Sequence, residues 1–338
     1  MTTVRASVID DRYALEGEKL EEEICGLLCE CITRPLAENG AFDGRLTELV
    51  KAEIIDSIDS VINDKAAYAA QCAAKTAFAG EPQESSPNGS HEEAEAITPA
   101  SAYGAYRRIL ETAHVEILCA GCSEFTAAEN AFVKLFSDGA GIVRHDICGL
   151  FVTASPLKPE PRYVSDTLPM EQAILRMYFK APELSDRFAN MVLTMVLGGM
   201  TTSRFFRNIR EKQSLCYYCA AAGSVYKKYL CAYAGVEPQN IERTEKAVLA
   251  ELADIAENGV TEEELSAALL ELRNSFSSLY DSANALGGWY LGRLLDEKIL
   301  SPEEYYEEAA KVTSERVAAV ARQYKLDTVY TLSGGDGE

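Results

Sequence analysis

The sequence is poor in histidine, in long apolar runs and in positive charge, and each shortage excludes a class of function. Its 338 residues include three histidines. No stretch approaches the ~20 apolar residues that a membrane-spanning helix needs. Residues 1–11 lack the basic start and apolar run of a secretory signal. The formal net charge of −21 repels nucleic acid and anionic membranes, so neither is expected as a partner.

What is present is typical of a globular protein. Apolar residues make up 47% of the chain, and its length accommodates two domains of ~100–150 residues. Ten cysteines without a secretory signal favour a reducing compartment, where thiols act as small apolar residues. We therefore expect a cytoplasmic protein without disulfides. The acidic surface favours basic or neutral ligands.

The spacing of apolar residues predicts an α+β protein, because strands and long helices are mixed without strict alternation. Helices are predicted from Glu18 to Thr33, Arg45 to Phe78, Ser101 to Leu110, Thr126 to Phe136, Ser185 to Leu197, Ile241 to Asn258, Glu262 to Leu295, Pro302 to Ala310 and Ser314 to Tyr324. Strands are predicted from Val4 to Asp10, Val115 to Ala120, Leu150 to Ala154, Ala173 to Lys180, Cys216 to Ser224, Tyr229 to Gly235 and Thr328 to Leu332. Residues 81–91 are predicted to form an exposed loop.

Two segments of the chain resemble copies of one another. Thr98 is the predicted N-cap of a helix that leads into the strand starting at Val115, and Thr313 is the predicted N-cap of a helix that leads into the strand starting at Thr328. The second copy extends further upstream than the first. We therefore expect a duplicated protein whose first half is shortened at its N-terminal end. We expect this protein to need a partner or to be marginally stable, because the shortening exposes apolar surface.

The domain boundary is predicted from composition. The stretch 155–169 (SPLKPEPRYVSDTLP) is rich in proline and is our predicted linker. It separates a first domain over 1–154 from a second over 170–338.

The run VLGGMTTSRFFRNIREKQSLCYY, residues 196–218, resembles the second-domain motif of the pitrilysin/insulinase family of zinc peptidases. Similarity continues through YAGVEPQNIER at 233–243 and covers nearly the whole chain. It is strongest to a non-catalytic bacterial branch, the YfmF-like proteins associated with modification of elongation factor P. The resemblance implies two insulinase-type domains, each a mixed or antiparallel sheet with helices on one face, the first truncated.

The resemblance also implies a substrate-binding pair. Family members hold the peptide backbone with an Arg and a Tyr that match Arg210 and Tyr217, and both side chains can donate hydrogen bonds to carbonyls. The plainer alternatives are a surface salt bridge for Arg210 and core packing for Tyr217. Gly198 and Gly199 are expected to end a helix, because glycine adopts the left-handed conformation without a Cβ penalty.

The zinc motif of the family is missing. Catalysis there needs His-x-x-Glu-His, with two imidazoles on one helical face. The histidines of this sequence are His91, His114 and His145, and no two are four apart. Glu53 and Asp56 lie where the family places a further ligand, but without histidine partners they are expected on a solvated helix face. We expect no cofactor, with zinc confined to an active paralogue.

Two Cys-x-x-Cys pairs offer another reading as a zinc or redox site. Cys119 and Cys122 are 97 residues away from Cys216 and Cys219, too far for a zinc ribbon. Within a regular strand, Cys216 and Cys219 would point to opposite faces. We therefore expect neither pair to bind metal.

Three functions remain open. The first is a catalytically inactive homologue that binds peptide and supports a zinc peptidase paralogue, as a heterodimer with it or as a homodimer. The second is a zinc endopeptidase whose metal-binding segment is absent from this chain. The third is a structural assembly subunit, in which Arg210 and Tyr217 serve packing alone.

Overall fold

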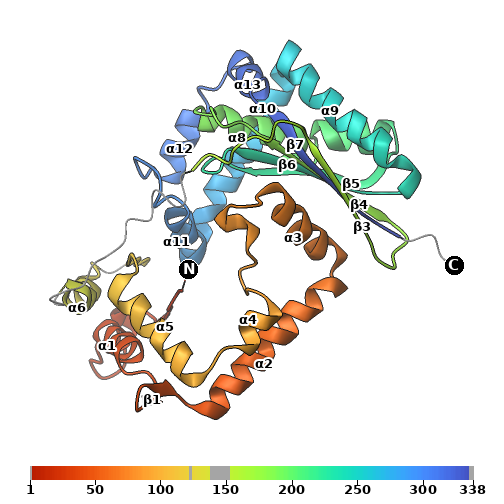
Figure 1. The fold of residues 1–338 in the computed structure, drawn as a ribbon. Coiled ribbons are helices and arrows are strands. Elements are labelled where there is room, and N and C mark those ends of the chain that lie inside the picture. Colours follow the sequence, from red (N-terminus) through yellow and green to blue (C-terminus); the bar gives the residue numbers. More distant parts are fainter. Residues whose placement is uncertain (1, 122–123, 138–152, 335–338) are drawn as a thin grey trace. The chain divides into compact units, whose positions relative to one another are not determined.

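The computed structural model describes residues 2–121, 124–137 and 153–334 (Figure 1). The chain divides into two compact units, each assembled from stretches far apart in the sequence. The first unit comprises Met1–Asp59, Asn88–Cys148 and Leu279–Leu294. The second comprises Ser60–Pro87, Gly149–Ser278 and Leu295–Glu338. The linker predicted at 155–169 stays a prediction, and a strand lies inside that stretch.

The second unit contains a five-stranded sheet in the order β3-β7-β4-β6-β5. Its strands are β3 (Arg162–Thr167), β4 (Ala173–Lys180), β5 (Cys216–Ser224), β6 (Tyr229–Val236) and β7 (Lys325–Ser333). Only the pair β3 and β7 is parallel, and the other neighbours are antiparallel. The predicted α+β class is confirmed, and β4 and β5 have the predicted bounds. The edge strand β3 was missed.

One face of the sheet is covered by helices (Figure 1). These are α8 (Arg187–Thr194), α9 (Ile241–Asn258), α10 (Glu262–Ser277), α12 (Pro302–Ala309) and α13 (Ser314–Ala321), with the π-helical segments η4 (Met195–Gly199) and η5 (Phe205–Lys212). Because side chains alternate along a strand, Leu175, Met177 and Phe179 of β4 point to this face, and all three are buried. We call this side the helix-covered face.

The opposite face of the sheet receives α3 (Lys65–Ala77). Ala69, Ala73 and Ala77 lie four residues apart on one side of this helix and pack against Tyr178 and Tyr330. Their small side chains let the helix approach the sheet closely. α3 lies over β7 and β4, and we call this side the α3 face.

Two long predicted helices are broken in the structure, which corrects the sequence prediction. α2 (Gly44–Ser60) ends before α3, because the Asp64 side chain accepts hydrogen bonds from the amides of Ala66 and Ala67 and starts a new helix. In the same way, Ser282 caps α11 (Ala283–Leu291) and separates it from α10. The apolar periodicity continues through both breaks and concealed them.

The first unit is mainly helical. It contains α1 (Leu20–Thr33), α2, α4 (His91–Glu95), α5 (Pro99–Thr112), α6 (Thr126–Ser137), α11 and the short strands β1 (Ala37–Glu38) and β2 (Ala41–Phe42). The strands predicted from Val4 to Asp10 and from Val115 to Ala120 are not formed, so this prediction was wrong. Most of the strand predicted from Leu150 to Ala154 lies outside the described residues. Extended backbone needs a partner strand for its hydrogen bonds, and none of the strands in the described part of the chain pairs with these two segments.

Short 3-10 turns connect several of these elements. They are η1 (Asp11–Tyr13), η2 (Val61–Asn63), η3 (Pro82–Glu84), η6 (Pro238–Asn240) and η7 (Ser278–Asp281). The predicted loop over 81–91 thus contains η3, and its last residue begins α4.

Candidate functional site

Strand β5 begins with a β-bulge. Cys216 pairs with Val236 and Tyr218 pairs with Gly235, so Tyr217 is an extra residue without a partner on β6. The extra residue shifts the alternation of side chains, and Cys216 and Cys219 therefore share one face of the strand. Our expectation that they point to opposite faces was wrong, because it assumed a regular strand.

The two thiols on this face interact. A hydrogen bond from Cys219, together with the nearby Arg210 guanidinium, lowers the pKa of Cys216 against the effect of burial. The same hydrogen bond and burial raise the pKa of Cys219. The pair is a local feature of the bulge, and no other Cys or His completes a metal site with it among the described residues.

Arg210 lies in the last turn of η5, shortly before β5. Its guanidinium carbon is 4.7 Å from the centroid of the Phe206 ring, which supports the cation from one side. Its Nε is 3.7 Å from a carboxylate oxygen of Glu211, too long for a hydrogen bond. The side chain is 43% exposed, so its donors remain accessible.

A buried ion network fixes the helix that carries Arg210. Arg204, at the start of η5, donates two 2.9 Å hydrogen bonds to the carboxylate of Glu264 on α10. It also donates to Asp254 and to the carbonyl of Gly259. Burial opposes ionisation of Glu264, but the hydrogen bonds from Arg204 lower its pKa. The network therefore ties the start of η5 to α9 and α10.

Tyr217, the extra residue of the bulge, is 49% exposed. Its hydroxyl donates a hydrogen bond to Glu237, with an oxygen-to-oxygen distance of 3.3 Å. Partial burial and the negative charges of Glu237 and Glu171 raise the pKa of Tyr217, so the phenol keeps its proton at neutral pH. The structure places Arg210 and Tyr217 at the same end of β5. No hydrogen bond between them is found among the described residues.

Gly198 and Gly199 lie in the π-helical turn η4, and neither has a positive φ. The left-handed helix end expected for them is therefore wrong. A Cβ on Gly198 would lie 2.3 Å from the backbone nitrogen of Ala221 on β5. Gly198 is needed because η4 approaches the strand closely, rather than because of its dihedral angles.

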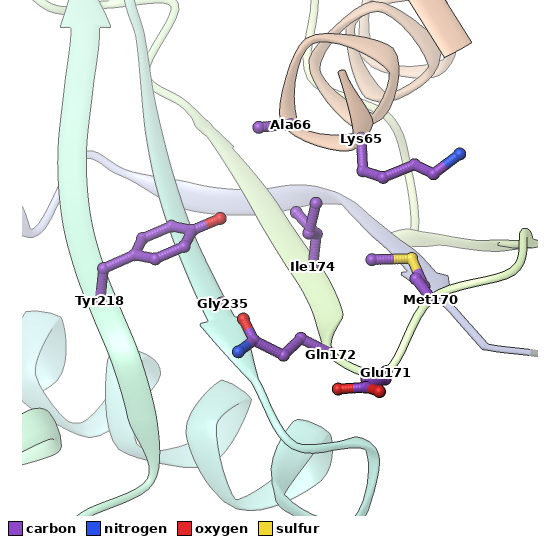
Figure 2. A pocket seen from close by; sticks show the side chains of 8 residues that line it. All are labelled: Lys65, Ala66, Met170, Glu171, Gln172, Ile174, Tyr218 and Gly235. Atoms are coloured by element: carbon purple, nitrogen blue, oxygen red, sulfur yellow. The ribbon is translucent and has the colours of Figure 1, made fainter. Parts of the chain in front are cut away.

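An open hollow of about 420 Å³ lies on the α3 face near the start of β5. It is lined by Lys65, Ala66, Met170, Glu171, Gln172, Ile174, Tyr218 and Gly235. Figure 2 shows the Tyr218 ring extending from β5 across β6 toward Ile174, with the first turn of α3 on the far side. Sequence reasoning missed this hollow, because the bulge at Tyr217 decides that Tyr218 points into it.

The two histidines that the structure describes do not form part of a metal site. His91 is 3.1 Å from Asp59, and this hydrogen bond raises the pKa of the imidazole. His114 contacts Glu116, and His145 lies outside the described residues, as does Cys122. Within residues 2–121, 124–137 and 153–334, no three His, Cys, Asp or Glu side chains gather closely enough to hold a metal ion.

Glu53 and Asp56, which match the place of a further metal ligand in the family, lie on α2 and are both exposed. Their exposure agrees with a solvated helix face. None of the described helices is long and apolar enough to cross a membrane.

Comparison with known proteins identifies the family. The model of the peptidase M16 inactive domain matches residues 96–272, more than half of the chain, and the chain belongs to this family. A probable inactive metalloprotease, YmfF of Bacillus subtilis strain 168, is 23% identical over 99% of this chain and 78% of its own length. The uncharacterized zinc protease SCO5738 of Streptomyces coelicolor is 32% identical over 40% of this chain and 30% of its own length.

Solved structures share the fold. A conserved protein of Enterococcus faecalis V583 matches 98% of this chain and 78% of its own with a TM-score of 0.84 and 21% identity. A peptidase M16 inactive domain from Pseudomonas fluorescens matches 94% of this chain and 76% of its own with a TM-score of 0.73 and 16% identity. The family resemblance drawn from the sequence is thus confirmed.

Proposed function

We propose that this chain is a non-catalytic M16 homologue that binds extended peptide at the start of β5 and assists a zinc peptidase paralogue. The observation that carries the proposal is the placement of Arg210 and Tyr217. Both are half-exposed hydrogen-bond donors beside an edge strand of the sheet. Peptide carbonyls are acceptors that both groups can bind.

The rest of the site supports binding over cleavage. The backbone that carries the two donors is well supported. The ion pair of Arg204 anchors η5, which carries Arg210, and the pairing of β5 with β6 positions the bulge that contains Tyr217. The described residues supply no ligand set for a hydrolytic zinc. In this proposal the metal belongs to the paralogue, and the two chains form a heterodimer in the cytoplasm. A homodimer is the alternative assembly.

Peptide binding is tested by fluorescence anisotropy with labelled unstructured peptides. Arg210→Gln and Tyr217→Phe each remove donors. Arg210→Gln is expected to weaken binding by about tenfold, since a hydrogen bond from a charged group contributes about 1.5 kcal/mol, and Tyr217→Phe by about threefold, since one between neutral groups contributes about 0.7 kcal/mol. Tyr163→Phe is the matched control, because Tyr163 is also exposed and donates to a glutamate, but on the opposite edge strand. Its affinity should not change.

The outcomes separate the three hypotheses. Unchanged affinity in both site variants would remove the peptide-holding role and favour a structural subunit. Stoichiometric zinc and peptide cleavage by the chain alone would instead support the endopeptidase. Higher peptidase activity of the paralogue when this chain is added, lost in Arg210→Gln, is the result expected for an assisting subunit.

A further inference from the structure

Arg176 is an arginine in a strand that is otherwise buried. β4 has the sequence AILRMYFK, and Arg176 alone among these eight residues is not fully buried. Its guanidinium carbon lies 5.1 Å from the centroid of the Tyr233 ring, and its Nη2 is 4.0 Å from the Cys231 sulfur. Its Nε is shielded from solvent and has no hydrogen-bond partner in the structure. The donors of this side chain are therefore largely unused.

Other arginines of the second unit have a carboxylate partner. Arg204 binds Glu264, Arg187 binds Asp296 and Arg316 binds Asp186, each at 2.8 or 2.9 Å. Among the described residues, no carboxylate lies within ion-pair distance of Arg176. Burying a guanidinium without a counter-charge costs stability. In a chain that carries 53 acidic residues, an arginine left without a carboxylate points to a ligand rather than to a structural role.

Two tyrosines complete the surroundings of this guanidinium. The Tyr233 ring stacks beside Arg176, and the ring centroids of Tyr218 and Tyr233 are 6.5 Å apart. The Tyr218 ring lies flat on Gly235, where a Cβ would come within 2.3 Å of it. Neither tyrosine hydroxyl has a hydrogen-bond partner among the described residues. Burial raises the pKa of Tyr218 against the opposing charge of Arg176, so its phenol stays a donor.

Tyr218 belongs both to the surroundings of Arg176 and to the lining of the hollow. Tyr218 lines the hollow on one side, and Ala66 of α3 lies across from it (Figure 2). The volume of about 420 Å³ is within the ~300–1,000 Å³ of ligand sites and accommodates a peptide segment. Two acidic groups face this region, Glu171 at the rim and Asp64 at the N-cap of α3. Asp64 is already bonded to two backbone amides of its own helix.

We propose that Arg176, with the hydroxyls of Tyr218 and Tyr233, binds a carboxylate of the peptide that the start of β5 holds. The proposal rests on the peptide-binding function above and adds the chemistry that it selects. A guanidinium presents paired N–H groups that match the two oxygens of a carboxylate, and phenols add donors from the side. The carboxylate belongs either to a peptide C-terminus or to an Asp or Glu side chain.

The inference refines the expectation from net charge. The total of −21 favours basic or neutral ligands at long range. Arg176 reverses this preference at one position, because within a few ångströms an unpaired guanidinium outweighs distant, screened charges. The favoured ligand is therefore a peptide of neutral or basic overall charge that carries one carboxylate at a defined place.

The experiment compares four labelled peptides of one core sequence. The first ends in a free carboxylate and the second in an amide. The third and fourth are amides with Glu or Gln at one internal position. The full chain should bind one of the carboxylate peptides at least tenfold more tightly than its neutral counterpart. The pair that shows the difference identifies the source of the carboxylate.

Variants assign the preference to Arg176. Arg176→Gln should abolish the difference and bind the amide peptide as the parent chain does. Arg176→Lys should keep a small part of it, because an ammonium cannot bind both oxygens in the same plane. Tyr218→Phe should reduce the preference by about threefold, as expected for one lost hydrogen bond. Arg243→Gln, an exposed arginine on α9, is the control and should leave the preference intact.

Two results would overturn the inference. One is equal affinity of the parent chain for the acid and amide peptides, and the other is a preference that survives in Arg176→Gln with an unchanged circular dichroism spectrum. In either case, binding that still depends on Tyr217 leaves the proposed function standing. Absence of binding for all four peptides would refute both proposals together.

Discussion

The two helix-and-strand segments that resemble copies in the sequence have different fates in the structure. Thr98 caps α5 and Thr313 caps α13, as predicted. After α13 the chain enters β7, which pairs with β3 and β4. After α5, residues 114–120 form no strand. Local signals start both helices, but a strand forms only where neighbouring strands satisfy its backbone.

The largest expected effect is a difference in unfolding free energy between leucine substitutions in the two segments. Leu332 on β7 is fully buried, whereas Leu118 in the other segment is 42% exposed. Leu332→Ala should lower the free energy of unfolding by about 3 kcal/mol, because it removes buried methyl groups and leaves a cavity. Leu118→Ala should lower it by less than about 1 kcal/mol. Urea denaturation followed by circular dichroism measures both values.

The comparison fails if the two substitutions cost the same. Equal losses would mean that residues 114–120 pack in solution as firmly as β7 does. Leu270→Ala, at an exposed position of α10, is a control for the loss of a leucine side chain from the surface.

A smaller effect is expected at the start of β7, where Asp327 is fully buried. Its carboxylate accepts hydrogen bonds from the backbone and side chain of Lys158, both at 3.0 Å, and Lys180 lies 3.6 Å away. Burial opposes ionisation, but the hydrogen bonds from Lys158 lower the pKa of Asp327 from its ordinary value. Asp327→Asn should cost about 2 kcal/mol at pH 7, since the neutral amide loses the charge-assisted bonds.

The stability difference between the parent chain and Asp327→Asn should depend on pH. A carboxyl group whose pKa is lower in the folded state stabilises the protein above its unfolded pKa, and this stabilisation is lost as the pH falls through the folded pKa. The difference between parent and Asp327→Asn should therefore shrink from pH 7 toward pH 3. Denaturant midpoints across this range measure it. A difference that grows on acidification would show that Asp327 is not an ionised partner of Lys158.

The sequence predicted those parts of the fold that local patterns determine. β4, β5 and α9 have their predicted bounds. The breaks at Asp64 and Ser282 were concealed, since the periodicity runs through each cap. β3 was missed because its polar residues and the prolines that flank it resemble a linker, although an edge strand needs only one bonded side.

The candidate site was predictable only in part, for a similar reason. Family resemblance located Arg210 and Tyr217 in the sequence. The bulge that makes Tyr217 an extra residue depends on pairing with β6, and nothing local to β5 indicates it. It also decides that Tyr218 faces the hollow. Arg176 did leave a signal, as the one arginine in an apolar strand, but its missing partner is visible only in three dimensions.

The smallest expected effect is that of removing the N-cap threonine from the helix of each copy. It tests whether the two helices differ in how much they pack against a core. Each N-cap threonine contributes about 1 kcal/mol to its helix. α13 buries Val317, Val320 and two alanines, whereas α5 has no buried residue. Thr313→Ala should therefore lower the global denaturant midpoint, because α13 is part of the helix-covered face and unfolds together with the sheet.

Thr98→Ala should leave that midpoint unchanged and speed hydrogen exchange only over α5 (Pro99–Thr112). The Thr98 hydroxyl accepts a 3.1 Å hydrogen bond from the Ser101 amide, and the Thr98 amide donates a 2.9 Å hydrogen bond to the Ser101 hydroxyl, so the cap itself is well formed. Any difference between the variants must then come from what each helix packs against. Mass spectrometry of exchanged peptides reads both effects in one sample. Equal shifts of the global midpoint in the two variants would show that α5 unfolds together with a core, as α13 does. The two copies would then differ in their strands but not in how their helices are stabilised.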